Sequence, residues 1–331
     1  MKEYPQFSVV IPMYNMKSYI VPVLDAIYSQ TILPEEIIIV DDGSKDGSSE
    51  EVTKFISSKE VGNIRLIKQK NEGAVSATNK GIFLSKQGLV CLIDSDAILL
   101  TNIWFEEVIK EFSDHKVGAV GGQIITLNKD NIWARIMGYD LEYRYSRISS
   151  KYVNHVSTCA TMYRRKIFEE IGFFDKQFKY GYDHDISYRI KKKGYNLIIL
   201  KTIEVGHFWK ETLFRYLKEQ FFSADGILKL IKKHPGKSRG NEVAGMGEYF
   251  HVPLFILFFT FLLISPVWNF LLYFSLLFLG VILLDRIYES YKIYTIKKDL
   301  LCFICLPFIH ILRDFVWTLS IFYFLKDELK K

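Results

Sequence analysis

Two carboxylates separated by a single residue, Asp94 and Asp96, are the side chains of this sequence with the clearest chemical potential. They follow the apolar run Gly88–Ile93, whose length and composition predict a buried strand. Open α/β sheets bind ligands beyond the carboxyl ends of their strands, which is where this pair falls. Carboxylate oxygens suit Mg²⁺ or Mn²⁺, whose coordination is often completed by substrate phosphates. A plain polar turn is the alternative, because so short a motif is a weak signal by itself.

Strands and helices alternate along the region that must position this pair. This alternation predicts an α/β fold with a mostly parallel, Rossmann-like sheet. We expect Ser44 or Asp46 to cap the second helix. The expected strands are Phe7–Met13, Glu36–Val40, Ile64–Lys68, Leu89–Ile93, Val117–Thr126 and Leu197–Val205, and the expected helices are Lys17–Gln30, Ser44–Ser57, Ala74–Leu84, Asn102–Phe112 and Ile186–Lys193.

Polar loops follow the first four strands of this pattern, and right-handed crossovers bring such loops to one edge of a sheet. They do not contain G-x-G-x-x-G or a P-loop, so neither a classical dinucleotide site nor a P-loop phosphate site is predicted. Their two acidic segments indicate a ligand bound with the help of a cation. The loops are Pro12-Met13-Tyr14-Asn15, Asp41-Asp42-Gly43-Ser44, Asn71-Glu72-Gly73 with Ala77, Asn79 and Gly81 in the helix beyond it, and Asp94-Ser95-Asp96.

Taken together, these motifs resemble family 2 glycosyltransferases of the GT-A fold over residues 7–125, with a looser likeness to about residue 235. The resemblance implies an inverting hexosyltransferase that uses a nucleotide-diphosphate sugar and a metal ion. Asp96 would then ligate the metal, and Asp94 would contact the ribose or the sugar. The remaining implied nucleotide-sugar contacts are Pro12, Tyr14, Asn15, Asp41, Asn71, Gly73, Asn79 and Ser95.

Inversion requires a general base that takes the proton of the acceptor. The family places it at the Asp of a Glu-Asp pair, which corresponds here to Asp183, although Tyr182 stands where the Glu is usual. Asp185 is the competing candidate, or it caps the helix that follows. His207 completes the metal site in related enzymes, and the alternative is a structural histidine.

The sequence that follows the base region bears on processivity. Processive synthases of the family carry Gln-x-x-Arg-Trp, whereas this chain has Gln220-Phe221-Phe222-Ser223-Ala224. The missing Arg and Trp favour transfer of a single sugar over extrusion of a polymer.

The C-terminal part of the sequence has the composition of a membrane region. Residues 252–284 contain no charged residue and no histidine. As one helix this stretch would be about 50 Å long, against a hydrocarbon core of about 30 Å. A two-span hairpin over about 250–284 with a break near Ser265–Asn269 fits better. A third apolar segment, about 300–325, contains His310, Arg313 and Asp314, so it either spans with its charges facing protein or re-enters near Pro307.

A basic amphipathic helix is expected at 211–234, and it favours either the membrane surface or a core position with one solvated face. The expected domains are therefore a catalytic domain (1–210), this interfacial helix with a linker (211–247) and a transmembrane region (248–331). Basic residues flank the apolar hairpin on both sides, which predicts a cytoplasmic catalytic domain. The net charge is +6, but the first 200 residues contain no long run of basic residues. Nucleic-acid binding is therefore not suggested.

These patterns favour a multi-pass membrane glycosyltransferase that acts in glycan biosynthesis. It would move one sugar, with Mg²⁺ or Mn²⁺, to a lipid-linked acceptor, either a polyprenyl or dolichyl phosphate or a diphosphate-linked saccharide. The alternatives are a processive polysaccharide synthase and a nonenzymatic membrane protein that binds sugar nucleotides.

Overall fold

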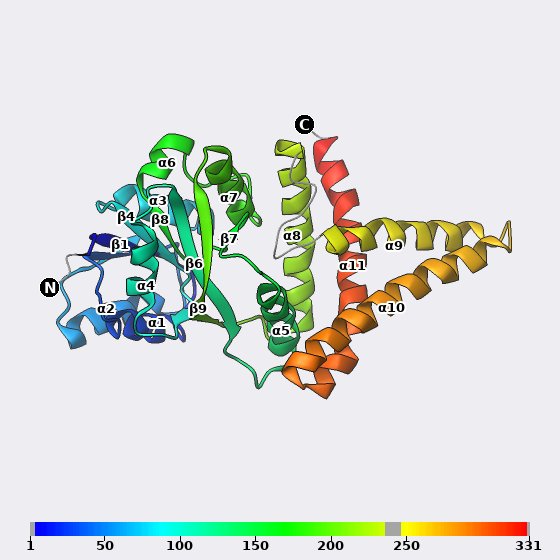
Figure 1. The fold of residues 1–331 in the computed structure, drawn as a ribbon, viewed down its shortest axis with the longest axis horizontal. Coiled ribbons are helices and arrows are strands. Elements are labelled where there is room, and N and C mark those ends of the chain that lie inside the picture. Colours follow the sequence, from blue (N-terminus) through cyan, green and yellow to red (C-terminus); the bar gives the residue numbers. More distant parts are fainter. Residues whose placement is uncertain (1–3, 236–245, 330–331) are drawn as a thin grey trace. The chain divides into compact units, whose positions relative to one another are not determined.

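The computed structural model describes residues 4–235 and 246–329. The chain forms two compact units (Figure 1). The first consists of Met1–Leu127 and Ile148–Phe208, and the second of Asn128–Arg147 and Trp209–Lys331. The expected linker up to residue 247 lies largely outside the described residues.

A nine-stranded sheet forms the centre of the first unit, in the order β3-β2-β1-β4-β8-β6-β9-β5 with β7 paired to β9. The four strands β1 to β4 are parallel to one another, as expected from the alternation of strands and helices. The other half is mixed, because β8 runs antiparallel to β4 and β6 while β9 runs parallel to β6. The strands are β1 (Phe7–Met13), β2 (Glu36–Asp41), β3 (Ile64–Lys68), β4 (Leu89–Ile93), β5 (Ala97–Leu99), β6 (Val117–Thr126), β7 (Tyr152–Val153), β8 (Ala160–Arg164) and β9 (Asn196–His207).

The expectation of a mostly parallel sheet is therefore corrected to a mixed α/β sheet. The short antiparallel strands β5, β7 and β8 were not predicted. β8 is only five residues long and is buried on both faces, so it carries little period-2 signal. β5 and β7 contain only three and two residues, which is too short for any periodicity to be read.

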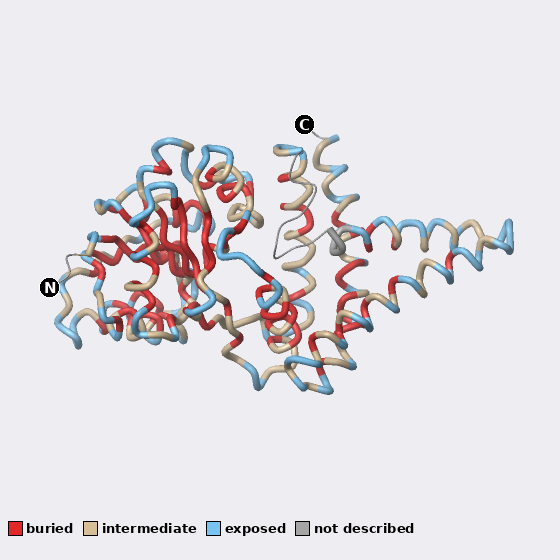
Figure 2. Tube along the Cα trace, viewed as in Figure 1, coloured by how far each residue is buried: buried red, intermediate tan, exposed pale blue. Residues whose placement is uncertain are grey.

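Helices α1 (Ile20–Tyr28), α2 (Ser48–Lys59), α3 (Ala74–Leu84), α4 (Trp104–Glu111), α6 (Lys166–Ile171) and α7 (Tyr182–Lys192) complete this unit. The expected cap of α2 is wrong, because the N-cap is Gly47, whose positive φ of 93° suits glycine. Asp46 instead accepts the backbone N–H of Ser48 at 3.0 Å. In α3, a Cβ at Gly81 would lie 2.2 Å from a methyl carbon of Val10, so this glycine lets the helix approach β1 closely. The strands carry most of the buried residues of the unit (Figure 2).

The second unit is helical: α5 (Ile132–Ser146), α8 (Leu213–Lys233), α9 (Met246–Ile264), α10 (Leu271–Lys297) and α11 (Leu300–Glu328). α5 lies within the expected catalytic domain 1–210 but belongs to this unit, which corrects that boundary. Ion pairs explain the assignment: Arg135 contacts Asp299 at 3.2 Å, and Glu142 accepts a hydrogen bond from Lys297. Ile136 and Met137 of α5 also join an apolar cluster with residues of α8, α10 and α11.

Two helices of the described chain, α10 and α11, are long and apolar enough to cross a membrane. Length and composition alone are a weak indication, since a core helix can pass the same test. In α10, however, only 17% of the apolar window is buried within the chain, which a soluble core helix would not show. The expected break after α9 is present, as α9 ends at Ile264 and α10 begins at Leu271. α11 is one continuous helix through Pro307, so re-entry near this proline is not observed.

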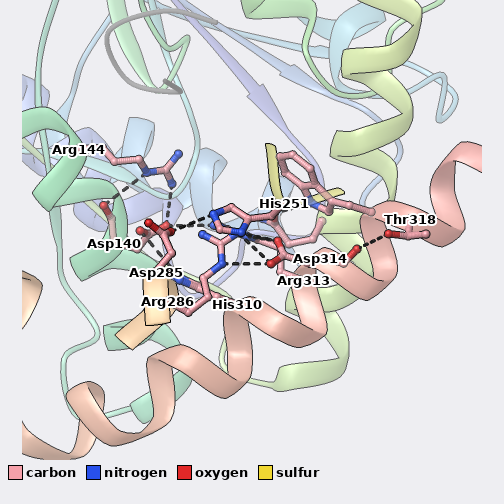
Figure 3. A network of polar contacts seen from close by, with 11 residues as sticks. Asp140, Arg144, His251, Asp285, Arg286, His310, Arg313, Asp314 and Thr318 are labelled. Carbon is pink, nitrogen blue, oxygen red and sulfur yellow. Dashed lines mark hydrogen bonds and ion pairs between the residues drawn. The ribbon is translucent and has the colours of Figure 1, made fainter. Parts of the chain in front are cut away.

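The charged residues in the middle of α11, Arg313 and Asp314, face other helices of the second unit (Figure 3). Arg286 of α10 and Asp314 of α11 form a bidentate pair, with Nη2 2.8 and 2.9 Å from the two carboxylate oxygens, and both side chains are 2% exposed or less. Asp140 of α5 lies 3.5 Å from Nη1 of Arg313 and 3.8 Å from Nε2 of His310. An apolar helix thus keeps its charges by pairing them inside the bundle.

The Arg286–Asp314 pair yields a stability prediction. Arg286→Met leaves Asp314 buried without its partner, so unfolding should become easier by about 3 to 5 kcal/mol. The double variant Arg286→Met/Asp314→Leu removes both charges and should recover most of that loss. Thermal unfolding in detergent micelles measures both, with Arg215→Met, at an exposed position of α8, as the matched control. Equal melting temperatures for Arg286→Met and this control would contradict the prediction.

The apolar stripe of α8 packs within the second unit. Ser320 of α11 donates its hydroxyl to the carbonyl of Phe221 at 2.8 Å, and the Phe221 and Tyr323 rings lie 5.4 Å apart. Leu213 and Leu217 pack against the apolar cluster that includes Ile136. This arrangement supports the core alternative for the stripe and leaves the basic face of α8 to be assigned.

Candidate active site

The carboxylate of Asp42 holds the loop after β2 to the loop after β3, and that of Asp41 binds the rest of the β2 loop and the start of α2. Asp42 is buried and accepts from Gln69 and from the backbone N–H groups of Glu72 and Gly73, each at 2.8 Å. Asp41 accepts the N–H of Ser44 at 2.9 Å and the hydroxyl of Ser49. The acidic loop after β2 therefore fixes its neighbours, and it keeps a buried carboxylate at the carboxyl edge of the parallel strands.

The other residues implied for the nucleotide sugar are spread over the same edge. Pro12 is the penultimate residue of β1, and Tyr14 follows the strand with 45% of its surface exposed. Asn15 has a φ of 55° and accepts the N–H of Lys45 at 2.9 Å. Asn71 and Gly73 lie in the exposed loop before α3, whereas Ser95 is buried. The amide of Asn79 is engaged in both directions by the backbone of Phe174, so its contacts are structural.

The structure brings the side chain of His207 close to those of Asp94 and Asp96. β5 pairs with the end of β9 so that Ala97 lies opposite His207, which brings Nε2 of His207 within 3.5 Å of a carboxylate oxygen of Asp96. Asp94, His207 and Cys159 each offer a ligand atom within 4.8 Å of the others. Two carboxylates and an imidazole form a donor set that fits Mg²⁺ or Mn²⁺.

Cys159 is a member of this group that the sequence did not reveal. Its carbonyl accepts the N–H of Asp94 at 2.8 Å. Burial, with Asp94 and Asp96 nearby, raises the pKa of its thiol well above the usual value. The thiol of Cys159 is therefore neutral at pH 7. The carboxylate oxygens and the imidazole nitrogen are then the donors that decide which metal the site prefers.

Asp183 lies in the first turn of α7, and each of its carboxylate oxygens has a partner. Oδ2 lies 3.1 Å from Nε2 of His155, and Oδ1 accepts the N–H of His184 at 2.9 Å. Burial by itself would raise the pKa of Asp183, but the neighbouring His184 and His155 outweigh it and hold the pKa well below its usual range. The residue is thus a carboxylate throughout the neutral range, which a general base must be.

Asp185, the competing candidate, is placed differently. Its side chain is fully buried, and its carboxylate accepts from Nε of Arg189 at 2.8 Å. Arg189 also donates to the carbonyls of Ile171 and Phe173, so the pair braces the chain before α7. Asp185 is not the N-cap of α7, because that position is Gly181.

The segment His155–Cys159 joins the two carboxylate groups of the site. Its first residue contacts Asp183 and its last contacts Asp94. Tyr182 interacts electrostatically with both Asp94 and Asp183, and burial raises the pKa of its phenol. The proposed metal motif and the proposed base thus belong to one continuous site in the first unit.

Comparison with known proteins identifies the region that contains Asp94 and Asp96. Residues 8–172 match the Glycosyl transferase family 2 model. The chain contains a glycosyltransferase family 2 domain. The chain is 36% identical to the glycosyltransferase GlyG of Streptococcus pneumoniae over 115 residues, which are 34% of this chain and 38% of GlyG. It is 26% identical to the poly-β-1,6-N-acetyl-D-glucosamine synthase of Staphylococcus aureus over 191 residues, which are 56% of this chain and 45% of the synthase. The chain therefore spans less than half the length of these two relatives.

The solved structures support the GT-A fold of the family 2 domain. The mannosyltransferase PcManGT from Pyrobaculum calidifontis, solved with GDP-Man and Mn²⁺, matches with a TM-score of 0.55 and 19% identity. The match covers 70% of this chain and 64% of PcManGT. At this identity the likeness shows a common fold. The GT-A fold expected from the strand-end motifs is thus confirmed.

Proposed function

We propose that this chain is an inverting, metal-dependent glycosyltransferase that moves one sugar from a nucleotide-diphosphate sugar to a lipid-linked acceptor. One observation carries the proposal: the segment His155–Cys159 contacts both parts of the site. Its first residue binds Asp183, and its last binds Asp94, which lies beside Asp96 and His207. Cation ligands and a deprotonated carboxylate within one site are what transfer from a diphosphate leaving group requires.

Each residue of the site has a separate task in this proposal. Asp183 takes the proton of the acceptor hydroxyl, whose oxygen forms a bond to the anomeric carbon of the sugar. The bond from that carbon to the diphosphate oxygen breaks on the opposite face, so the configuration inverts. Asp96, Asp94 and His207 would hold Mg²⁺ or Mn²⁺, which neutralises charge on the departing diphosphate. Asp185, enclosed with Arg189, is assigned a structural role.

Several observations support an acceptor at a membrane. α10 exposes many large apolar side chains, among them Leu276, Leu277 and Leu284. α8 carries Arg215, Lys218, Lys229, Lys232 and Lys233, and basic residues near an anionic surface contribute about 1 kcal/mol each. Lys229 and Lys232 pair with Asp225 and Glu328, which reduces that contribution.

We place the catalytic unit in the cytoplasm, and labelling a cysteine at Asn269 from outside intact cells tests this orientation.

The second candidate function is a processive polysaccharide synthase, favoured by the likeness to the S. aureus synthase. Against it, Gln220 is not followed by Arg-Trp and its side chain accepts a hydrogen bond from Trp317 at 3.2 Å, a contact between α8 and α11. A nonenzymatic sugar-nucleotide-binding protein is the third candidate.

Product analysis separates these candidates. The full chain in detergent is incubated with Mn²⁺, a panel of radiolabelled nucleotide sugars and a polyprenyl phosphate or lipid-linked saccharide. We expect one nucleoside diphosphate released for each lipid that gains one sugar. A ladder of extended products would replace the proposal by the synthase. Binding of a nucleotide sugar with no nucleoside diphosphate released would favour the nonenzymatic candidate.

A further inference from the structure

Two histidines, His155 and His184, lie beside the carboxylate of the proposed base, Asp183. His155, in the segment before β8, is 5% exposed. Its ring stacks on that of His184, with centroids 3.9 Å apart and planes inclined by 19°. Both rings contribute to the low pKa of Asp183, and the phenols of Tyr163 and Tyr182 also interact with its charge. His155, His184, Tyr163 and Tyr182 are thus titratable neighbours of Asp183 within the described part of the chain.

A metal site is one interpretation of this cluster, because His155, Asp183 and His184 each place a ligand atom within 4.8 Å of the others. An ion must lie close to the plane of each imidazole that binds it, about 2 Å from the nitrogen. Planes inclined by 19° through rings 3.9 Å apart meet only roughly 10 Å away. No single ion position satisfies both stacked rings, so the geometry disfavours a metal.

Hydrogen bonding gives the better account of His155. Its Nδ1 is buried and has no hydrogen-bond partner among the described residues, whereas Nε2 faces Oδ2 of Asp183. The ring therefore carries a proton on Nε2, where Asp183 accepts it. Asp183 then accepts two hydrogen bonds, one at each oxygen, from His155 Nε2 and from the backbone N–H of His184.

We propose that His155 is a positioning residue that fixes the carboxylate of Asp183 in one rotamer for its role as the base. The inference rests on the proposed function, because it assumes that Asp183 takes the acceptor proton. His155 belongs to the same segment as Cys159, whose carbonyl binds the N–H of Asp94. The contact therefore also ties the position of the base to the motif that would hold the metal.

The test compares side chains that can and cannot donate to Asp183. His155→Leu removes the donor and should lower kcat about 10- to 100-fold, the value of a hydrogen bond to a charged group. The KM for the nucleotide sugar should change little. His155→Gln retains an N–H donor of similar reach and should restore most of kcat. His115→Leu, at an exposed histidine of the same unit, is the matched control.

The pH profile distinguishes positioning from a general loss of structure. A base loses activity as the pH falls through its pKa. Losing a donor to the charged form raises that pKa, so the acid limb of kcat/KM should move to higher pH in His155→Leu. His155→Gln should keep the limb near its wild-type position, and His115→Leu should not move it. Melting temperatures confirm that each variant is folded, and His155→Asn, which is too short to reach, replaces the leucine variant if that one unfolds.

The outcomes separate the two levels of the proposal. Wild-type kcat and an unmoved acid limb in a folded His155→Leu, with Asp183→Asn inactive, would overturn the role of His155 alone. Wild-type activity of Asp183→Asn would overturn the assignment of the base itself. If His155→Gln and His155→Leu lost the same amount of kcat and neither moved the acid limb of kcat/KM, the role of His155 would be in packing. That result would contradict the proposed positioning role.

Discussion

Asp183→Asn is expected to lower kcat by about 10²- to 10⁴-fold, the usual value of a general base. Asparagine retains the shape of the side chain and can still accept hydrogen bonds through its amide oxygen. It cannot take a proton from the acceptor hydroxyl. The KM for the nucleotide sugar should remain close to wild type. Asp183 lies in α7, whereas the motif that would hold the diphosphate follows β4 and meets the end of β9. Initial rates with saturating donor and acceptor measure the effect.

Asp185→Asn is the matched comparison, two residues along the same helix. Its carboxylate is buried against Arg189, so removing the charge should lower the melting temperature more than it lowers kcat of the folded enzyme. A nearly wild-type Asp183→Asn beside a folded but inactive Asp185→Asn would reverse the assignment of the base.

The low pKa of Asp183 also affects stability. A carboxyl group whose pKa is lower in the folded than in the unfolded chain stabilises the fold above its unfolded pKa, near 4. That contribution is lost as the pH falls through the folded pKa. The asparagine variant lacks it at neutral pH, so its melting temperature must be measured before any loss of kcat is assigned to chemistry.

The parallel half of the sheet was predictable from the sequence because β1, β2 and β4 are mainly apolar runs that alternate with helical segments. β1, β3 and β4 have the bounds expected, as do β6 and α3. Loops at the ends of such strands must meet at one edge, so the proximity of the strand-end motifs followed from topology alone. His207 was expected near this motif from the family resemblance, and it ends β9 beside β5.

What the sequence could not give depends on contacts between distant residues. His155 lies in an irregular segment without periodicity, and its contact with Asp183 depends on the antiparallel strand β8 that was not predicted. Cys159 is brought to Asp94 by the same pairing of β4 with β8. The assignment of α5 to the helical unit is fixed by ion pairs with residues more than 150 positions away, which no local pattern encodes.

Asp96→Ala is expected to abolish transfer to lipid, and an excess of EDTA should do the same to the unaltered chain. The diphosphate leaving group carries negative charge that must be neutralised as the sugar departs, and Asp96 is the ligand that the resemblance assigns to that cation. Its side chain and that of His207, 3.5 Å away, are both partly exposed rather than fully buried, so the fold should persist. Rates of nucleoside diphosphate release with and without added Mn²⁺ measure the loss.

The control for this prediction is another carboxylate of the same unit. Asp114→Ala, at an exposed position after α4, should retain full activity and the same requirement for Mn²⁺.

Asp96→Ala should also lose the increase in melting temperature that Mn²⁺ with a nucleotide sugar gives the wild type, since a ligand that binds only the folded state stabilises it. The shift in melting temperature does not depend on turnover, so it separates loss of the cation from loss of the base. Asp183→Asn should keep the shift while losing activity. Full turnover of the wild type in excess EDTA would contradict metal dependence, and the assignment of Asp94, Asp96 and His207 as a cation site would then fail with it.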